Sequence, residues 1–299
     1  MAIRLIAIDI DGTLLDSTHQ IPEANQKAVV AAVERGIEVA LVTGRRYTFA
    51  MPVAERIPAP LTMIVNNGAL IRSKQGATFH RQLLPRETAR RVLGATMDFR
   101  LGALVHFDRP RTGQIQYESI DWANPGRSDY WRRNQEFIAQ SVPLEDCLIE
   151  DPIQLMYTGG VEHMASLTEV LTGLEYARSF SFQVTQYGYR DFTLVDVLHP
   201  DVSKGAALRE WCGRQGYAQA EVMAIGDNYN DREMLGFAGV PVVMGNSVPE
   251  LRGNGWHTTG TNDEAGVAQA IEKFALSAQG RKGNKPGGRR RRPRAKQVE

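Results

Sequence analysis

The chain has 299 residues, of which 42% are hydrophobic, and a formal net charge of +1, so it can bury a sizeable core and is long enough for two domains. No stretch approaches the roughly 20 apolar residues that a membrane span needs, and two well-separated cysteines exclude a disulfide-rich scaffold. The start of the chain also lacks the features of a signal peptide, which leads us to expect a cytoplasmic enzyme without membrane contact.

The first part of the chain alternates strand and helix patterns. Short apolar runs rich in β-branched residues occupy 3–10, 37–42 and 61–65, as in strands that are covered on both faces. Alanines and valines recur at helical spacing after Pro22, and a second helical stretch follows Tyr47. This β-α-β-α-β order predicts a parallel, doubly wound sheet.

The pattern changes after the third strand. Residues 69–83 are typical of a hairpin, and the block 85–192 lacks the parallel rhythm, which returns after Lys204. We therefore expect a discontinuous α/β core made of residues 1–84 and 193–277, with an α+β domain inserted at 85–192. The further strands are expected at 102–107, 115–119, 152–158, 181–187, 221–226 and 240–244, and the further helices at 86–99, 162–172, 203–214, 230–236 and 263–276.

The end of the chain differs from the rest in charge. Residues 278–299 carry nine of the 35 Lys and Arg residues and one of the 34 acidic residues, which leaves this tail at about +8 and the rest at about −7. A segment of Arg, Lys, Gly and Pro cannot bury apolar surface, so we expect a disordered basic tail. The tail is the one segment whose charge suits nucleic acid.

Four short polar motifs follow predicted strands or begin predicted helices. The first, DIDGT at 9–13, ends the first strand. Its two carboxylates, two residues apart, can reach one site beyond the carboxyl ends of the strands, where open α/β sheets bind ligands. Gly12 allows a sharp turn that brings backbone N–H groups near an anion. On its own, an Asp-Gly loop is also a common turn.

The other three motifs are equally ordinary in isolation. TGR at 43–45 offers a hydroxyl and an N–H to a phosphate oxygen, or forms a turn. Lys204 begins a helix, as surface lysines often do, and GDNYND at 226–231 supplies two more acids or a capped helix start. Together they combine hard oxygen ligands, which suit Mg²⁺, with a lysine, which suits phosphate. We therefore expect a magnesium and phosphate site.

These four motifs, in this order, resemble those of the haloacid dehalogenase superfamily. An insertion between the second and third motifs is typical of members with a C2-type cap. VNNGA at 65–69, VSKGAAL at 202–208 and GDNYNDREML at 226–235 are similar to Cof-type phosphatases of subclass IIB. The resemblance covers nearly everything except the tail. It implies a Rossmann-like doubly wound core, a C2-type cap, and a Mg²⁺-dependent phosphatase that hydrolyses small phosphorylated metabolites.

The resemblance and the residue chemistry imply the same catalytic roles. Asp9 would be the nucleophile that forms an aspartyl-phosphate, and Asp11 would protonate the leaving alcohol and then activate water. Mg²⁺ would be held by the side chains of Asp9 and Asp227 and, as the resemblance implies, by the main-chain carbonyl of Asp11. Asp231 would ligate through water or hold Lys204, or it would simply cap a helix.

The phosphoryl oxygens would be bound by Thr43, the N–H of Gly44, Lys204, the Ile10 backbone and Asn230. Asn67 and Gly68 would lie where the cap meets the core, or form a plain turn. Arg45 and Arg46 would face the substrate, or belong to a solvated helix start.

Several functions stay open at this point. An acid at position 11 disfavours a dehalogenase, because that reaction does not need one. A phosphomutase of the same fold is the nearest enzymatic alternative, and a non-catalytic polyanion-binding protein that works through its basic tail is the alternative from another class. Sugar phosphates, flavin mononucleotide, pyridoxal phosphate and nucleotides all remain open as substrates, and the sequence sets no oligomeric state.

Overall fold

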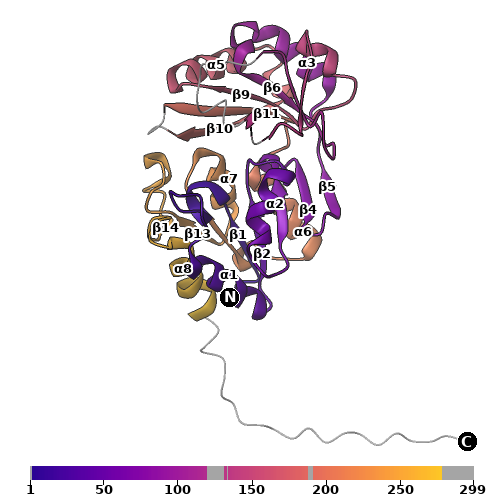
Figure 1. The fold of residues 1–299 in the computed structure, drawn as a ribbon. Helices are drawn as coiled ribbons and strands as arrows, with labels where there is room; N and C mark the ends of the chain where they lie inside the picture. Colours follow the sequence, from indigo (N-terminus) through magenta and orange to yellow (C-terminus); the bar gives the residue numbers. More distant parts are fainter. Residues whose placement is uncertain (1, 120–130, 133, 188–190, 278–299) are drawn as a thin grey trace, which may run out of the picture.

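The computed structural model describes residues 2–119, 131–132, 134–187 and 191–277. They form two halves, one above the other in Figure 1, and each half has its own sheet and helices. The tail at 278–299, expected to be disordered, lies outside these residues. Among the helices of the described part, none is long and apolar enough to cross a membrane.

The lower half of the molecule in Figure 1 is built on an eight-stranded sheet in the order β14-β13-β12-β1-β2-β3-β4-β5. Neighbours from β14 to β3 pair in parallel, whereas β3, β4 and β5 pair antiparallel. This arrangement confirms the predicted parallel sheet. Its strands are β1 (Leu5–Ile8), β2 (Glu38–Val42), β3 (Thr62–Val65), β4 (Leu70–Ser73), β5 (Thr78–Arg81), β12 (Val222–Gly226), β13 (Val240–Val243) and β14 (His257–Thr258).

Helices cover both faces of this sheet because its central strands are apolar on both sides. Ile6 and Ile8 pack in one cluster with α1, α2 and α8, and Leu5 and Ala7 pack in another with α6 and α7. All four side chains are fully buried. The helices are α1 (Glu23–Glu34), α2 (Tyr47–Glu55), α6 (Lys204–Gln215), α7 (Arg232–Phe237) and α8 (Gly266–Ile271), the last continued by a π-helical turn at Glu272–Leu276.

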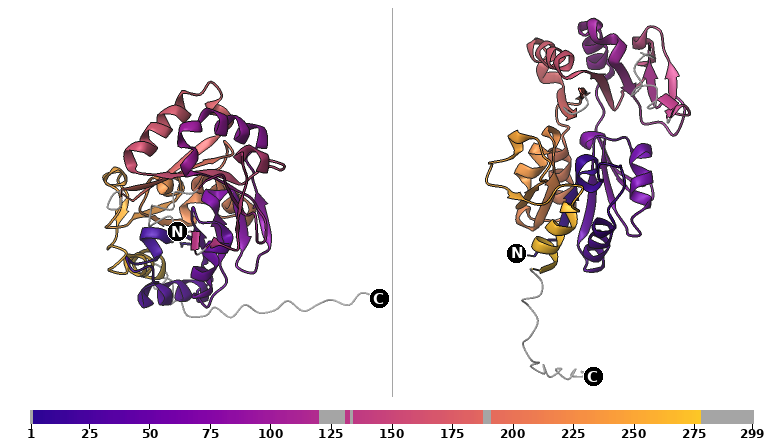
Figure 2. Two further views of the ribbon diagram at one scale, coloured as in Figure 1. Left: turned by 45° about the horizontal axis from the view of Figure 1, so that its top comes forward. Right: turned by 60° about the vertical axis from the view of Figure 1, so that its left-hand side comes forward.

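The upper half, which we call the cap, is a six-stranded sheet in the order β10-β11-β9-β6-β7-β8. The helices α3 (Arg86–Ala95) and α5 (Val161–Gly173) cover the face of this sheet that points away from the core (Figures 1 and 2). Its other face lies over the core sheet. The elements are β6 (Ala103–His106), β7 (Ile115–Tyr117), β8 (Ile138–Gln140), β9 (Gln154–Gly159), β10 (Ser181–Tyr187), β11 (Phe192–Leu198), α3 (Arg86–Ala95) and α5 (Val161–Gly173).

The cap sheet extends further along the chain than the sequence predicts. In β11, Val195 pairs with Val184 of β10 and with Tyr157 of β9, so residues 193–198 belong to the cap sheet and not to the core sheet. The buried Asp196 interrupts the apolar pattern of this strand, which obscures it in the sequence. The short strands β8 and β14 are likewise missing from the elements expected above.

Candidate active site

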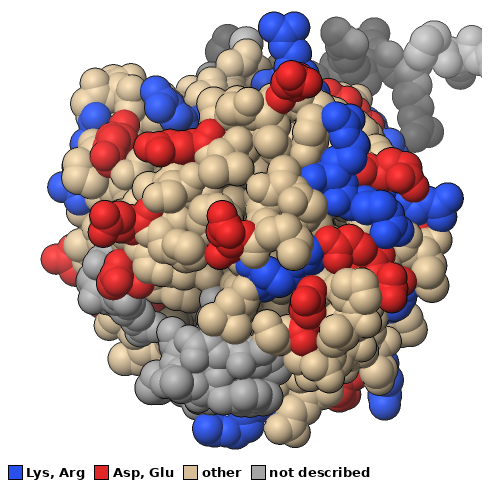
Figure 3. Space-filling view, turned by 90° about the horizontal axis from the view of Figure 1, so that it is seen from above, with Lys and Arg blue, Asp and Glu red and all other residues tan. Residues whose placement is uncertain are grey.

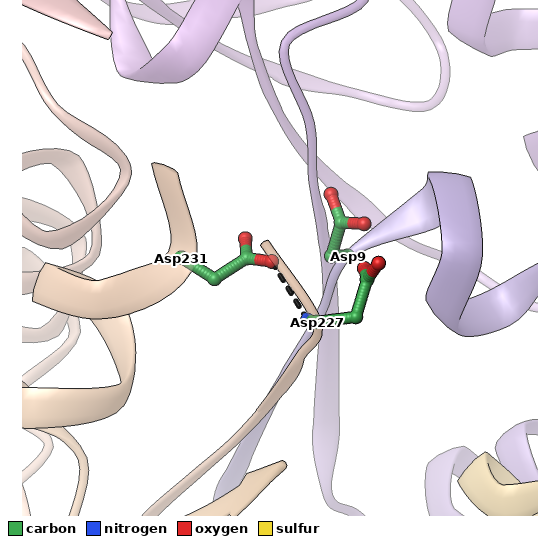
Figure 4. Close-up of side chains that lie close together, drawn as sticks. All are labelled: Asp9, Asp227 and Asp231. Atoms are coloured by element: carbon green, nitrogen blue, oxygen red, sulfur yellow. Dashed lines mark hydrogen bonds between the residues drawn. The ribbon is translucent and has the colours of Figure 1, made fainter. Parts of the chain in front are cut away.

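The polar residues that were expected to act together lie at one edge of the core sheet. Asp9 directly follows β1, Thr43 follows β2 and Asp227 follows β12, and these three strands are adjacent and parallel. Their carboxyl ends therefore share the edge that lies beneath the cap. Asp231 comes from a short helical turn, Tyr229–Asp231, and its carboxylate points towards Asp9 and Asp227 (Figure 4).

Lys204, at the start of α6, links two of these acids. Its Nζ lies 2.6 Å from Oδ1 of Asp9 and 2.6 Å from Oδ1 of Asp231, and the side chain is buried. Ser203 caps the helix, because its hydroxyl accepts from the N–H of Ala206. Burial lowers the pKa of Lys204, but the charges of Asp231 and Asp9 outweigh burial and raise this pKa, so the ammonium stays charged.

The acids around Lys204 carry more negative charge than one lysine balances. Burial raises the pKa of Asp9 to about 7; Lys204 opposes this shift, while Asp231 and Asp11 add to it. Burial, together with the charges of Asp9 and Asp231, also raises the pKa of Asp227 well above its usual range. The site therefore favours the entry of a positive charge.

Three carboxylates fit a divalent cation. Asp9, Asp227 and Asp231 each offer one oxygen, and these oxygens all lie within 4.8 Å of one another (Figure 4). Hard oxygen ligands are those that Mg²⁺ prefers, and a bound cation would offset the repulsion between the three acids.

The loops that carry these acids fold tightly against each other. Thr13 Oγ1 donates to Oδ1 of Asp227 over 2.8 Å. Gly12 has a φ of 78° and passes so close to the Asp227 carboxylate that a Cβ would collide with it. The glycine of the DIDGT motif is therefore required both by its backbone conformation and by the approach of the second acidic loop.

Asp231 was expected to bind the metal through water, to hold Lys204 or to cap a helix, and the structure shows the second and third of these contacts. One carboxylate oxygen binds Lys204, and the other accepts from the N–H groups of Asp227 and Asn228, over 2.9 and 3.0 Å. The latter contacts form a capping box with Asn228 at the start of the turn. Asp231 thus both holds the lysine and orders the loop that presents Asp227.

Asp11 lies at the rim of the site and is bound by Arg45. The guanidinium donates from Nε over 2.7 Å and from Nη2 over 2.5 Å, to the two carboxylate oxygens. The sequence placed both residues in motifs but not in contact with each other. Their pairing depends on how the loops after β1 and β2 meet at the sheet edge.

The residues expected to bind phosphoryl oxygens also gather here. Thr43 Oγ1 accepts from the N–H of Arg45 over 3.1 Å, and Ile10 is fully buried. Gly44 lies against Asn67, whose Oδ1 would be 3.2 Å from a Cβ on Gly44. Asn230 Nδ2 donates to this same oxygen of Asn67 over 2.9 Å. The NH₂ group of Asn230 therefore has one further N–H for a ligand.

Cap residues reach the same loops. Arg46 donates to Gln114 of the cap over 2.8 Å, and Asn228 Nδ2 donates to the Gln186 carbonyl over 3.1 Å. A cavity of about 370 Å³ lies where core and cap meet, and Asp9, Asp227 and Asp231 are not among its lining residues. Its lining includes Arg46, Tyr47, Asn66, Arg72, Asp108 and Arg109.

Comparison with known proteins identifies a family that matches most of this chain. A family model described as haloacid dehalogenase-like hydrolase matches residues 6–271, which span the core and the cap.

Individual proteins of known sequence or structure are similar over most of their length. A putative phosphatase, YxeH of Bacillus subtilis, is 29% identical over 284 residues, which cover 92% of this chain and 99% of that protein. A second B. subtilis protein, the 5-amino-6-(5-phospho-D-ribitylamino)uracil phosphatase YcsE, is 28% identical over 274 residues, covering 92% and 96%. A solved haloacid dehalogenase-like hydrolase from B. subtilis shares the fold, with a TM-score of 0.76, 24% identity and coverage of 90% and 99%.

Proposed function

This chain belongs to the haloacid dehalogenase-like hydrolases, and from that membership we propose that it is a Mg²⁺-dependent phosphatase of small phosphomonoesters in the cytoplasm. The observation that carries the proposal is the buried Asp9 carboxylate, which is bound by Lys204 at 2.6 Å and lies beside Asp227 and Asp231. A carboxylate nucleophile splits one difficult displacement into two easier ones.

Two half-reactions account for the chemistry. In the first, a carboxylate oxygen of Asp9 bonds to phosphorus while the bond to the ester oxygen breaks, and Asp11 gives its proton to that oxygen. In the second, Asp11 takes a proton from water, the water oxygen bonds to phosphorus, and the bond to Asp9 breaks. The products are an alcohol and orthophosphate, and both acids return to their starting states.

The remaining residues of the site support these steps. Lys204, Thr43 and the N–H of Gly44 would hold the phosphoryl oxygens, with the Ile10 backbone and the second N–H of Asn230 as further donors. Mg²⁺, held by Asp9, Asp227 and the Asp11 carbonyl, with Asp231 through water, would neutralise charge between nucleophile and phosphate.

The substrate class follows from the cap. The cap lies over the carboxyl ends of the core strands (Figure 1), so the proposed site accommodates a small leaving group rather than a macromolecule. We therefore favour a small phosphorylated metabolite such as a sugar phosphate.

The alternatives have less support. The binding alternative depends on the basic tail at 278–299, which supplies none of the acids of the site. On the outer face of the cap, acidic and basic side chains are interspersed (Figure 3), so this face adds no basic surface for a polyanion. A complete set of acids also favours catalysis over a purely binding role. A phosphomutase would return the phosphoryl group to its substrate, so release of orthophosphate separates it from a phosphatase.

Phosphate release tests the proposal directly. The protein is assayed on p-nitrophenyl phosphate and on a panel of phosphorylated metabolites, with Mg²⁺ and with EDTA. Asp9→Asn should lose several orders of magnitude in kcat, as other nucleophile variants do. Asp98→Asn, an exposed aspartate of the cap, serves as the matched control and should retain wild-type activity. If Asp9→Asn kept a tenth of the activity, Asp9 would not be the nucleophile.

A further inference from the structure

A chain of three buried polar side chains connects the cap to the phosphate-binding loops. Asn67 Nδ2 donates to Oδ2 of Asp196 on β11 over 2.8 Å, and Asn67 Oδ1 accepts from Nδ2 of Asn230 over 2.9 Å. The exposed fractions are 3% for Asp196, 0% for Asn67 and 5% for Asn230. This series of hydrogen-bonded side chains therefore begins in the cap sheet and ends in the acidic loop of the core.

The hydrogen bonds of this chain run in one direction. The second oxygen of Asp196 accepts from Nε2 of Gln154 over 2.6 Å, so both carboxylate oxygens act as acceptors. Because Oδ2 of Asp196 accepts in this arrangement, the NH₂ group of Asn67 has to point towards the cap. If the Asn67 amide turned over, its NH₂ group would face the NH₂ group of Asn230. Asp196 thus determines the orientation of both amides.

The backbone around Asn67 is strained and attached to the core. Asn66 and Asn67 have φ values of 50° and 52°, and Gly68 follows with 104°; such left-handed conformations are strained for residues other than glycine. The N–H of Asn66 donates to the Arg45 carbonyl over 2.9 Å, and the N–H of Asn67 donates to the Thr43 carbonyl over 3.0 Å. A movement of this turn would therefore move residues 43–45.

Asn67 also packs directly on the predicted phosphate-binding loop. The Asn67 amide lies so close to Gly44 that a Cβ atom at position 44 would be only 3.2 Å from Oδ1 of Asn67. On the other side, Asn230 lies in the loop that carries Asp227 and Asp231. One amide thus touches both loops that meet at the active site.

We propose that Asp196 is a positioning residue: from the cap, it orients Asn67 and, through it, Asn230 and the loop of Gly44. This proposal rests on the proposed phosphatase function. Asp196 binds neither phosphate nor metal in this scheme. Its effect is that the phosphate-binding loops adopt their working arrangement when the cap sheet lies against the core.

The test compares Asp196→Asn with a control in the same cap sheet. An asparagine can accept only one of the two N–H groups, so one hydrogen bond is lost. Tyr157→Phe removes a buried hydrogen bond to Thr96, which measures 2.7 Å, on the opposite face of the sheet. Both variants should lower the melting temperature, which separates loss of stability from loss of positioning.

Three readouts are measured for each protein: kcat and KM on p-nitrophenyl phosphate, the affinity for inorganic phosphate, and amide hydrogen exchange of residues 43–46, 66–68 and 226–231. Asp196→Asn should reduce kcat/KM and phosphate affinity by about tenfold to a hundredfold, as the loss of a residue that orients a ligand does. It should also accelerate exchange in these segments. Tyr157→Phe should leave all three readouts unchanged.

A double variant tests whether Asp196 acts through Asn67. Asn67→Gly removes the amide but suits the positive φ of 52°. Adding Asp196→Asn to Asn67→Gly should cause no further loss of phosphate affinity. Should Asp196→Asn not fold, Asn67→Gly alone should show the same tenfold or larger loss.

Unchanged phosphate affinity and kcat in Asp196→Asn, or in Asn67→Gly if that variant alone folds, would overturn the positioning role. Strictly additive losses in the double variant would overturn it as well. A wild-type protein that releases no phosphate from any ester would instead refute the proposed function. Hydrogen exchange would then still report whether Asp196 orders the three core segments.

Discussion

Arg45 holds the carboxylate of Asp11 with two parallel hydrogen bonds, from Nε over 2.7 Å and from Nη2 over 2.5 Å. The guanidinium carbon in turn lies 4.9 Å from the centre of the Phe49 ring. A planar fork of this kind fixes the orientation of a carboxylate as well as its position. The proposed acid and base of the reaction is therefore aligned by the loop that also carries Thr43 and Gly44.

Replacing Asp11 by asparagine should separate the two half-reactions. The amide can still accept one hydrogen bond from Arg45, so the loop should keep its shape, but it cannot carry the proton. We expect kcat to fall by about a hundredfold to ten-thousandfold. Because p-nitrophenolate leaves without protonation, phosphorylation of Asp9 should proceed and hydrolysis should stall, and mass spectrometry should detect the phosphorylated protein. Absence of this species together with wild-type turnover would contradict the role of Asp11.

Magnesium should stabilise the fold as well as support turnover. Repulsion between Asp9, Asp227 and Asp231 is relieved by a cation, so Mg²⁺ at a hundred times its Kd should add about 2.7 kcal/mol to the free energy of unfolding. Thermal denaturation with Mg²⁺ and with EDTA measures this effect. Asp227→Asn should be more stable than wild type without metal, because it removes one buried charge, and should gain little from Mg²⁺. An equal Mg²⁺ shift in both proteins would place the metal elsewhere.

His106 should remain neutral far below the usual pH of histidine protonation. Both ring nitrogens are buried without a hydrogen-bond partner in the described part of the chain. Burial, and then the charge of Arg46, lower the pKa of His106 to about 3 from 6.5. Among the six histidines, one NMR resonance should thus stay unchanged down to pH 5, and His106→Gln should remove it.

The same group makes stability depend on pH. Between pH 6.5 and 3, His106 binds a proton in the unfolded chain but stays neutral in the folded chain. The contribution of His106 to the free energy of unfolding is therefore complete above pH 6.5 and falls as the pH falls. The loss should reach about 2 kcal/mol by pH 5. The pKa of Asp196, which burial raises to about 7, acts in the opposite direction, but wild type and His106→Gln share it. The pH dependence of unfolding should therefore be weaker in His106→Gln by this amount.

Removal of residues 278–299 should leave catalysis intact. Every residue proposed for the site precedes position 232, so kcat on p-nitrophenyl phosphate should change by less than about twofold, which is well under 1 kcal/mol. Any binding to RNA at low salt should disappear with the tail, because the remaining chain is net acidic. A folded, truncated protein without activity would assign the tail to the active site.

The sequence was sufficient to predict which residues meet at the sheet edge. Asp9, Thr43 and Asp227 each follow an apolar run, and the carboxyl ends of adjacent parallel strands must share an edge. The position of Lys204 came from the resemblance, since nothing local distinguishes it from a surface lysine. For the same reason, motif order carried more information than any single motif.

Contacts between distant segments could not be predicted in this way. The partner of Asn67 lies 129 positions further along the chain, and the choice of partner depends on how the cap rests on the core. Asp196 also breaks the apolar pattern of β11. The buried carboxylate that binds Asn67 is therefore also the reason that this strand was not predicted. Arg45 could be read as facing either substrate or solvent, and the fold instead directs it to Asp11.

The division of the Asp196–Asn67–Asn230 chain between cap and core limits how caps can be exchanged. A chimera that joined this core to the cap of a relative would receive new walls for the leaving group, yet Asn67 would lose its acceptor unless the donor cap carried a carboxylate at the same place in its strand. Such a hybrid should fold and still turn over poorly. Restoring one aspartate in the grafted strand should then recover activity without altering the choice of substrate.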